Sequence, residues 1–98
     1  MKKYLLFTLI ALFGINNLKA AEIKENALYC ISLKKVESYY NYLEKGFEGS
    51  AQKLINDSDC FIKKRTEKAL FKSETDKYIE LEDLKGFTIW TKKENIKK

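Results

Sequence analysis

Residues 78–91 read YIELEDLKGFTIWT, two alternating apolar runs joined by a turn that contains a glycine. In the first run, 78–82, Ile79 and Leu81 fall on one face of an extended chain, because side chains alternate between the two faces of a strand. The second run, 87–91, is rich in β-branched and aromatic residues, which favour strands. The stretch therefore predicts two neighbouring antiparallel strands.

Two further extended segments lie upstream, at 60–63 and 68–72, with a charged turn between them. A polar turn at 73–76 connects the second segment to Tyr78. Short strands that follow one another at intervals of about 8–10 residues are typical of a small antiparallel β-barrel. The tail carries one apolar residue, Ile96, and we expect it to close the end of the barrel.

Residues 32–56 predict two helices. Apolar residues follow Ser32 at steps of three and four and form one stripe. The stripe comprises Val36, Tyr39, Tyr40, Leu43 and Phe47. Ser32 fits the N-cap position, Gly46 ends the first helix, and a second helix fits 48–56. A binding surface formed by the three tyrosines at 39, 40 and 42 is the alternative, but two of them lie on the stripe, which favours core packing. Tyr42 falls off the stripe, and we expect it to be exposed.

Residues 1–20 have the three-part layout of a secretory signal peptide. Lys2 and Lys3 precede an apolar run at 4–15, and a more polar stretch ends at Ala20. This run is shorter than the roughly 20 residues that a membrane-spanning helix requires. We therefore predict cleavage after Ala20, a periplasmic or secreted protein, and no stable membrane insertion after cleavage. The alternative is an uncleaved anchor.

The positive charge of the chain belongs largely to this leader. The whole sequence has a net charge of +5, but residues 1–20 hold three of the 19 basic residues and no acid. Residues 21–98 therefore carry 16 basic against 14 acidic groups, and Arg65 is the only arginine. A nucleic-acid surface needs clustered basic residues, arginine above all, so no nucleic-acid partner is expected.

The two cysteines, Cys30 and Cys60, predict a disulfide. In an oxidising compartment an even cysteine count in a short chain indicates a cross-link, and only one pairing exists here. A bridge that closes a loop of this length stabilises the fold by about 3–4 kcal/mol. A redox-active pair is the alternative, but such pairs usually stand two residues apart.

The residue types restrict the available chemistry. The sequence contains no histidine, which removes imidazole catalysis and every histidine-containing metal site. A cysteine nucleophile would lack its usual base. Glu80 and Glu82 share a strand face and could in principle act as paired carboxylates, but an exposed polar face explains them better. We therefore expect a protein that is not an enzyme, with no cofactor and no metal.

Residues 60–96 resemble a degenerate bacterial SH3-like domain. The segments that carry the resemblance are Glu67–Lys72, Lys77–Glu82 and Gly86–Thr91. Residues 21–98 as a whole are similar to small exported bacterial proteins in which a cysteine-bearing helical segment precedes such a barrel. The ending Gly86-x-x-x-Trp90-Thr91-x-x-Glu94 is the cue for this similarity. One departure is that residues 64–66 replace the glycine usual at the first turn.

The predicted fold class is therefore α+β, with two short helices followed by a small antiparallel SH3-like barrel. A signal peptide at 1–20 precedes a single domain at 21–98. Within that domain we expect a helical half at 21–59 and the barrel at 60–98.

The resemblance implies binding through an aromatic groove, because SH3-like barrels bind peptides between aromatic-lined loops. Tyr78, Phe87 and Trp90 are the candidate contacts, and the alternative is that they fill the core.

The leading hypothesis is an exported accessory module that binds a protein partner or a cell-wall peptide. A small inhibitor or immunity protein, acting through a protruding loop at 73–76 or 83–86, is the second. A membrane-tethered structural protein is the third.

Overall fold

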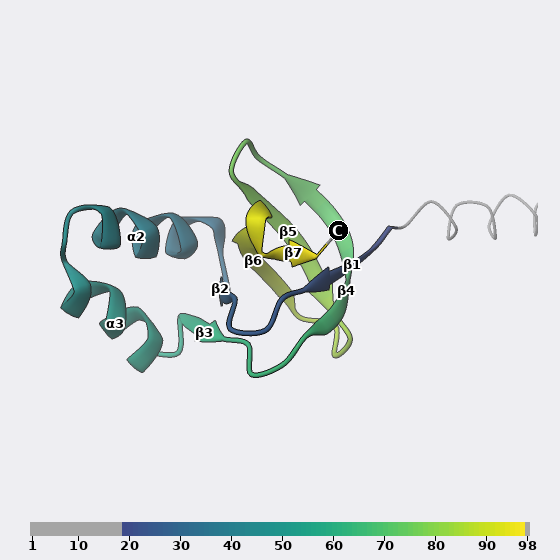
Figure 1. The fold of residues 1–98 in the computed structure, drawn as a ribbon, viewed down its shortest axis with the longest axis horizontal. Helices are drawn as coiled ribbons and strands as arrows, with labels where there is room; N and C mark the ends of the chain where they lie inside the picture. Colours follow the sequence, from purple (N-terminus) through teal and green to yellow (C-terminus); the bar gives the residue numbers. More distant parts are fainter. Residues whose placement is uncertain (1–18, 98) are drawn as a thin grey trace, which may run out of the picture.

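A computed structural model describes residues 19–97, which form two helices and one antiparallel sheet of seven strands (Figure 1). The elements are β1 (Ala20–Ile23), β2 (Leu28–Cys30), α2 (Leu33–Glu44), α3 (Glu48–Asn56), β3 (Cys60–Ile62), β4 (Glu67–Glu74), β5 (Tyr78–Asp83), β6 (Thr88–Lys92), the 3-10 turn η1 (Lys93–Asn95) and β7 (Ile96–Lys97). The predicted α+β class is confirmed. Within this part of the chain, neither helix has the length and apolar character that a membrane span requires.

The sheet is curved but does not close into the predicted barrel. Its strand order is β3-β2-β6-β5-β4-β1-β7, and no ladder joins the edge strands β3 and β7 within residues 19–97. These edges are three and two residues long, and the β1–β2 connection runs between them. Lys24 N–H donates to the Asn95 carbonyl (2.9 Å), and Asn26 N–H donates to the Lys63 carbonyl (2.8 Å). The Lys63 N–H also donates to the Ala27 carbonyl (2.9 Å), so these few hydrogen bonds take the place of a closing ladder.

Two strands come from the segment that the sequence analysis assigned to the helical half. β1 lies between β4 and β7, and β2 lies between β3 and β6, so both are interior strands. They are four and three residues long, too short for alternation to reveal them. The first residues of the described chain thus complete a sheet whose other strands follow the helices.

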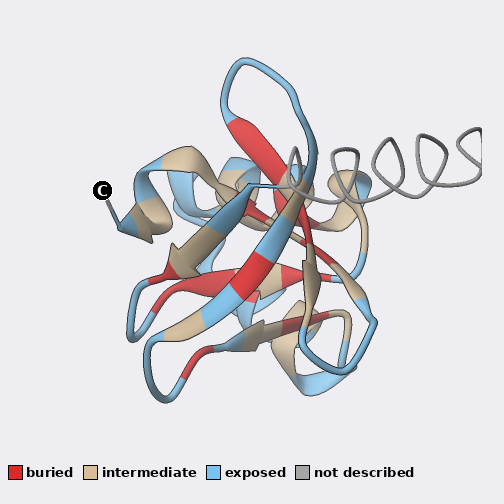
Figure 2. Cartoon of the chain, turned by 90° about the vertical axis from the view of Figure 1, so that its right-hand side faces the viewer, coloured by how far each residue is buried: buried red, intermediate tan, exposed pale blue. Residues whose placement is uncertain are grey.

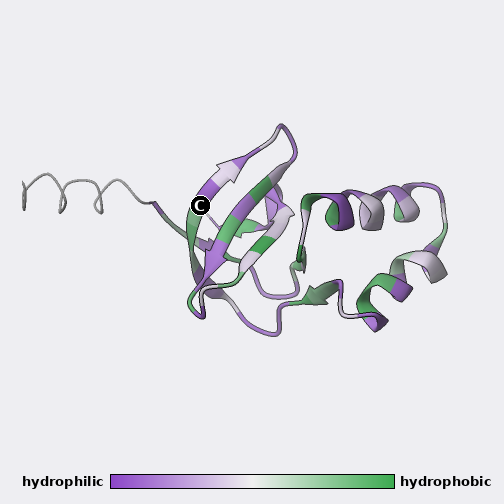
Figure 3. Ribbon diagram, turned by 180° about the vertical axis from the view of Figure 1, so that it is seen from behind, coloured by the Kyte–Doolittle hydropathy of each residue, from purple (hydrophilic) through white to green (hydrophobic). Residues whose placement is uncertain are grey.

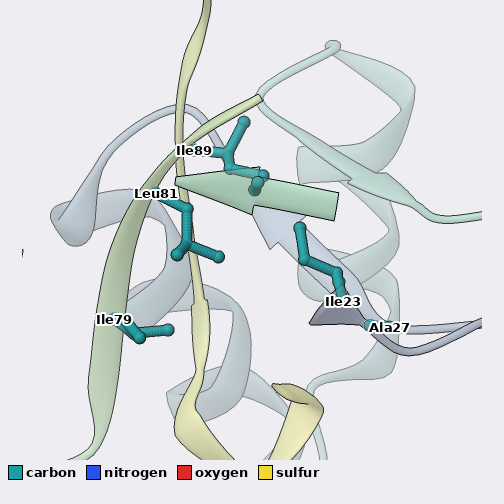
Figure 4. Close-up of a cluster of buried hydrophobic side chains, with 6 residues drawn as sticks. Ile23, Ala27, Ile79, Leu81 and Ile89 are labelled. Carbon is teal, nitrogen blue, oxygen red and sulfur yellow. The ribbon is translucent and has the colours of Figure 1, made fainter. Parts of the chain in front are cut away.

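The inner face of the sheet forms the main core (Figure 4). Its buried members are Ile23, Ala27, Ala69, Ile79, Leu81 and Ile89, with Ile96 of β7 packed against them. Ile79 and Leu81 are buried on this face, as their alternation predicts, and Figure 3 shows the matching alternation of hydropathy along the strands. A bulge in β4 between Phe71 and Ser73 bends this long strand around the core.

The two helices pack on the opposite face of the sheet, where α2 contacts β2 and β6 and α3 contacts β3. A second cluster lies at this interface and contains Leu28, Cys30, Val36, Cys60 and Tyr78. Partly buried residues surround it, namely Leu33, Tyr39, Tyr40, Leu54, Ile55 and Trp90. The buried residues therefore lie mainly on the strands, while the loops and much of the helical surface are exposed (Figure 2).

The helix ends follow the sequence prediction, but the apolar stripe is only partly buried. Ser32 caps α2 by accepting a hydrogen bond from the Lys35 N–H (3.2 Å). Gly46 has a φ of 80°, a backbone conformation that favours glycine and ends the helix. Leu43 and Phe47 are exposed, contrary to expectation, because the far end of the helical hairpin extends beyond the sheet (Figure 1).

The predicted disulfide between Cys30 and Cys60 is present, with an S–S distance of 2.04 Å. The two cysteines are directly opposite each other on β2 and β3, and both are fully buried. The disulfide links β2 and β3, the two strands that flank the helical hairpin formed by α2 and α3. It is compatible with an oxidising, exported location.

The predicted signal peptide lies outside the described residues, except for Lys19 and Ala20. Ala20 already begins β1, opposite Leu70 of β4. The Phe71 N–H donates to the Lys19 carbonyl (2.8 Å). The predicted cleavage bond after Ala20 therefore falls inside a strand that is paired in this structure.

Candidate binding surfaces

The three aromatic residues predicted to form a binding groove lie in different environments. Tyr78 begins β5 and is only 7% exposed, whereas Phe87 precedes β6 and is 64% exposed. Tyr78 is opposite Lys92 at one end of the β5–β6 hairpin, and Phe87 lies in the turn at the other end. The structure therefore separates Tyr78 and Phe87 instead of placing them in one groove.

Trp90 lies in the middle of β6, between Cys30 of β2 and Glu80 of β5. Its half-buried side chain packs against the cluster between the helices and the sheet. This position gives Trp90 a part in holding the helical hairpin on the sheet.

The β5–β6 connection, residues 83–87, is an ordered turn that we call the apical turn. The Asp83 carboxylate accepts hydrogen bonds from the backbone N–H groups of Lys85 (3.0 Å) and Phe87 (2.9 Å). The Asp83 N–H donates to the Phe87 carbonyl (2.9 Å), and Gly86 supplies a φ of 91°. The Asp83 side chain thus holds the backbone of the apical turn in place through hydrogen bonds inside the turn.

The apical turn presents two large apolar side chains to solvent. Leu84 is 75% exposed and Phe87 is 64% exposed, the two most exposed large hydrophobic residues of the described chain. Single exposed apolar residues are common on protein surfaces, but two on one internally bonded turn form a raised apolar tip. Because the backbone is already ordered, little conformational entropy would be lost when this tip binds a partner.

A second surface feature lies at the other end of β5, between that strand and α2, and we call it the α2–β5 groove. Two adjoining hollows of about 340 and 310 Å³ share Asp76, Lys77 and Tyr78. Their remaining lining residues are Glu37, Asn41 and Glu44 of α2, Thr75 of the β4–β5 hairpin, and Lys92, Lys93 and Glu94 at the end of β6 and in η1. The groove is therefore walled by charged groups from three segments that are distant in sequence.

Tyr78 lies at the junction of these two hollows. The hairpin holds its backbone, since the Thr75 N–H donates to the Tyr78 carbonyl (2.8 Å) and the Tyr78 N–H donates to Thr75 Oγ1 (3.1 Å). Burial raises the pKa of the Tyr78 hydroxyl, and the negative charges of Glu37 and Glu44 raise it further. The phenol therefore stays neutral to a higher pH than an unperturbed tyrosine does.

Tyr40 of α2 packs next to Tyr78, with ring centroids 6.3 Å apart. The Lys92 ammonium lies 4.0 Å from the centroid of the Tyr40 ring, in a cation–π contact. Burial raises the pKa of Tyr40 and outweighs the opposing effect of a hydrogen bond with Asn95. These contacts join α2 to the end of β6 along one side of the groove.

Sequence reasoning identified part of these surfaces. It named 83–86 as a protruding turn and Phe87 as a contact, and Leu84 lies within that turn. It missed Glu37, Asn41 and Glu44, although their spacing of four and three residues marks a polar face of a helix. The sequence did not show that the β4–β5 hairpin lies opposite that face.

Comparison with protein-family models, curated protein sequences and solved structures found no match to this chain. The resemblance to SH3-like domains therefore remains a prediction.

Proposed function

We propose that this protein is an exported, non-catalytic binding module that inserts its apical turn into an apolar pocket of a protein partner. The exposure of Leu84 and Phe87 on a turn that Asp83 holds from within is the observation that carries this proposal. In this proposal the disulfide stabilises a small sheet and helical hairpin in an oxidising compartment, the periplasm or the medium. The sheet acts as the support of the turn.

Several features support a binding role over a catalytic one. The chain has no histidine, and both cysteines are joined in a buried disulfide. Of the aromatic residues predicted as contacts, Phe87 belongs to the proposed binding surface. Trp90 is assigned to packing, and Tyr78 to the separate α2–β5 groove. An SH3-like ancestry would be consistent with this role but is not needed for it.

The test is a capture experiment with the oxidised protein as bait. Wild type is compared with Leu84→Ser/Phe87→Ser, which removes the apolar tip but keeps Asp83 and Gly86. Leu43→Ser/Phe47→Ser is the matched control, because it removes two exposed apolar residues from the far end of the helical hairpin. Periplasmic extract and purified cell-wall sacculi are the two targets, and circular dichroism checks the fold of each bait.

We expect wild type and the control to retain one protein that the apical-turn variant loses. Its purified form should then bind with a 1:1 stoichiometry, at least about 30-fold more weakly to the apical-turn variant, as expected for loss of two buried apolar side chains. Retention of the protein by all three baits would contradict binding through the apical turn. Turn-dependent recovery with sacculi alone would contradict a protein partner. Turn-dependent loss of activity in a captured enzyme would identify the inhibitor alternative.

A further inference from the structure

We propose that the α2–β5 groove binds the cationic side chain of a lysine or arginine presented by a peptide segment. This site is independent of the apical turn, because the two features lie at opposite ends of β5. The inference rests on three observations within residues 19–97: a phenol that faces the groove without a partner, carboxylates outside any ion pair on facing walls, and ion pairs that engage two of the three lining lysines.

The floor of the groove is the side chain of Tyr78. This residue is 93% buried, given its exposed fraction of 7%, and its hydroxyl forms no hydrogen bond with any residue between 19 and 97. Within the same residues, no fully buried side-chain nitrogen or oxygen lacks a partner, so the hydroxyl must be reachable from the groove that it lines. The ring is therefore enclosed while the hydroxyl faces the groove without a protein partner among these residues, so it is free to hydrogen-bond a bound ligand.

The walls carry exposed carboxylates that a cation in the groove can reach. Glu37, Asn41 and Glu44 recur at four and three residues, which places them along one side of α2. Glu37 lines one of the two hollows together with Tyr78, and Glu44 lines the other. Asp76 extends the acidic lining on the hairpin opposite. A primary ammonium or guanidinium donates several charge-assisted hydrogen bonds, which such a set of oxygens can accept.

The lysines of the groove do not neutralise these acids. Lys92 lies over the Tyr40 ring and 3.7 Å from Glu94, and Lys93 lies 3.7 Å from Glu74. No ion pair among residues 19–97 involves Glu37, Glu44 or Asp76. Lys77 is the one groove lysine outside these pairs in the described chain. In this part of the chain, three acids outside any ion pair therefore face one such lysine, and this excess of negative charge favours a cation over an anion.

The volume of the groove fits one side chain. Its two hollows, of about 340 and 310 Å³, are at the lower end of the range of roughly 300–1,000 Å³ for ligand sites. The hollows adjoin along the hairpin, so the backbone of a bound segment can follow residues 75–78 while one side chain points down to Tyr78.

The test is a titration of the ¹⁵N-labelled, oxidised protein with blocked tripeptides, Ac-Gly-Lys-Gly-NH₂ and Ac-Gly-Arg-Gly-NH₂. The N-acetyl-lysine tripeptide is the neutral control ligand. We expect saturable shifts of the Asp76, Lys77 and Tyr78 amide signals with the cationic peptides and none with the acetylated one. Added salt should weaken binding, because charge attraction contributes to it.

Four variants test which residues form the binding site. Glu37→Gln/Glu44→Gln should weaken binding by about tenfold or more, since hydrogen bonds to charged groups are replaced by neutral ones. Tyr78→Phe keeps the ring and should weaken binding several-fold. Glu48→Gln on the exposed face of α3 and the Leu84→Ser/Phe87→Ser variant should both bind as wild type. Absence of saturable shifts, equal binding of the acetylated peptide, or unchanged binding by Glu37→Gln/Glu44→Gln would overturn the proposal.

Discussion

At the residue scale, the buried polar side chain of Thr91 connects three segments. Its hydroxyl donates to the Leu28 carbonyl of β2 (2.6 Å) and accepts from the Asn95 side-chain amide (2.8 Å). The residue is fully buried in β6. Its role is therefore to satisfy polar groups that would otherwise be buried without partners.

We predict that Thr91→Val destabilises the protein by about 1–3 kcal/mol, although valine has nearly the same shape. The loss follows because the buried Leu28 carbonyl and the partly buried Asn95 amide lose their shared partner. Urea unfolding monitored by tryptophan fluorescence measures it. Thr88→Val, on the less buried part of the same strand, is the control and should change stability by less than about 0.5 kcal/mol. Equal effects of the two substitutions would contradict this role.

Lys63 shows how a charged residue is accommodated in a small protein. It is only 8% exposed, yet its ammonium lies 2.9 Å from the Glu67 carboxylate and 4.7 Å from the centroid of the Tyr29 ring. The ring of Tyr29 stacks on Phe61. A paired charge and an aromatic face together offset the cost of removing the ammonium from water.

At the scale of elements, the contact between α2 and the sheet depends on neutral tyrosines. The pKa values of Tyr40 and Tyr78 are both raised above the value of 10.0 for an unperturbed tyrosine, with burial as the main cause. Above pH 10 the unfolded chain releases these protons while the folded protein retains them. Stability is therefore insensitive to these groups below pH 10 and falls as the pH rises from 10 towards the higher folded values.

We predict that Tyr40→Phe/Tyr78→Phe reduces this alkaline loss of stability. Urea unfolding at pH 8 and pH 11 gives the loss for each protein. Tyr42→Phe keeps both buried phenols and should lose as much stability as wild type. The same loss in the double variant would show that the two phenols do not govern the alkaline behaviour.

At the scale of the whole molecule, β1 links the predicted removal of the leader to folding. The predicted cleavage bond after Ala20 lies in a strand paired with β4, and Lys19 already bonds to Phe71. A peptidase needs an accessible extended segment. If the leader is removed as predicted, cleavage must therefore come before β1 joins the sheet.

We predict that the protein recovered from the periplasm or the medium begins at Ala21 and has a mass lower by two hydrogens than the reduced chain. Intact-mass spectrometry before and after reduction measures both features. Reduction should also lower the unfolding free energy by about 3–4 kcal/mol, because the loop between Cys30 and Cys60 is no longer constrained in the unfolded state. Recovery of a species that retains residues 1–20 would support the tethered alternative.

The sequence by itself predicted the features that depend on local periodicity and on cysteine count. Ser32, Gly46 and the helix at 48–56 follow from capping and spacing, and the alternation at Ile79 and Leu81 predicted which residues enter the core. The disulfide followed from the only possible pairing of two cysteines. These predictions are confirmed because each depends only on residues that are close in the sequence or, for the disulfide, on the one possible pairing of two cysteines.

Tertiary structure alone decided the rest. β1 and β2 are too short to show a period, and they are strands because β4, β7, β3 and β6 supply their hydrogen bonds. The open edge of the sheet, the exposure of Leu43 and Phe47, and the separation of Tyr78 from Phe87 depend on where the helical hairpin and the β1–β2 connection pack. The α2–β5 groove likewise forms only because long-range packing places the polar side of α2 next to the β4–β5 hairpin. No local sequence pattern predicts that contact.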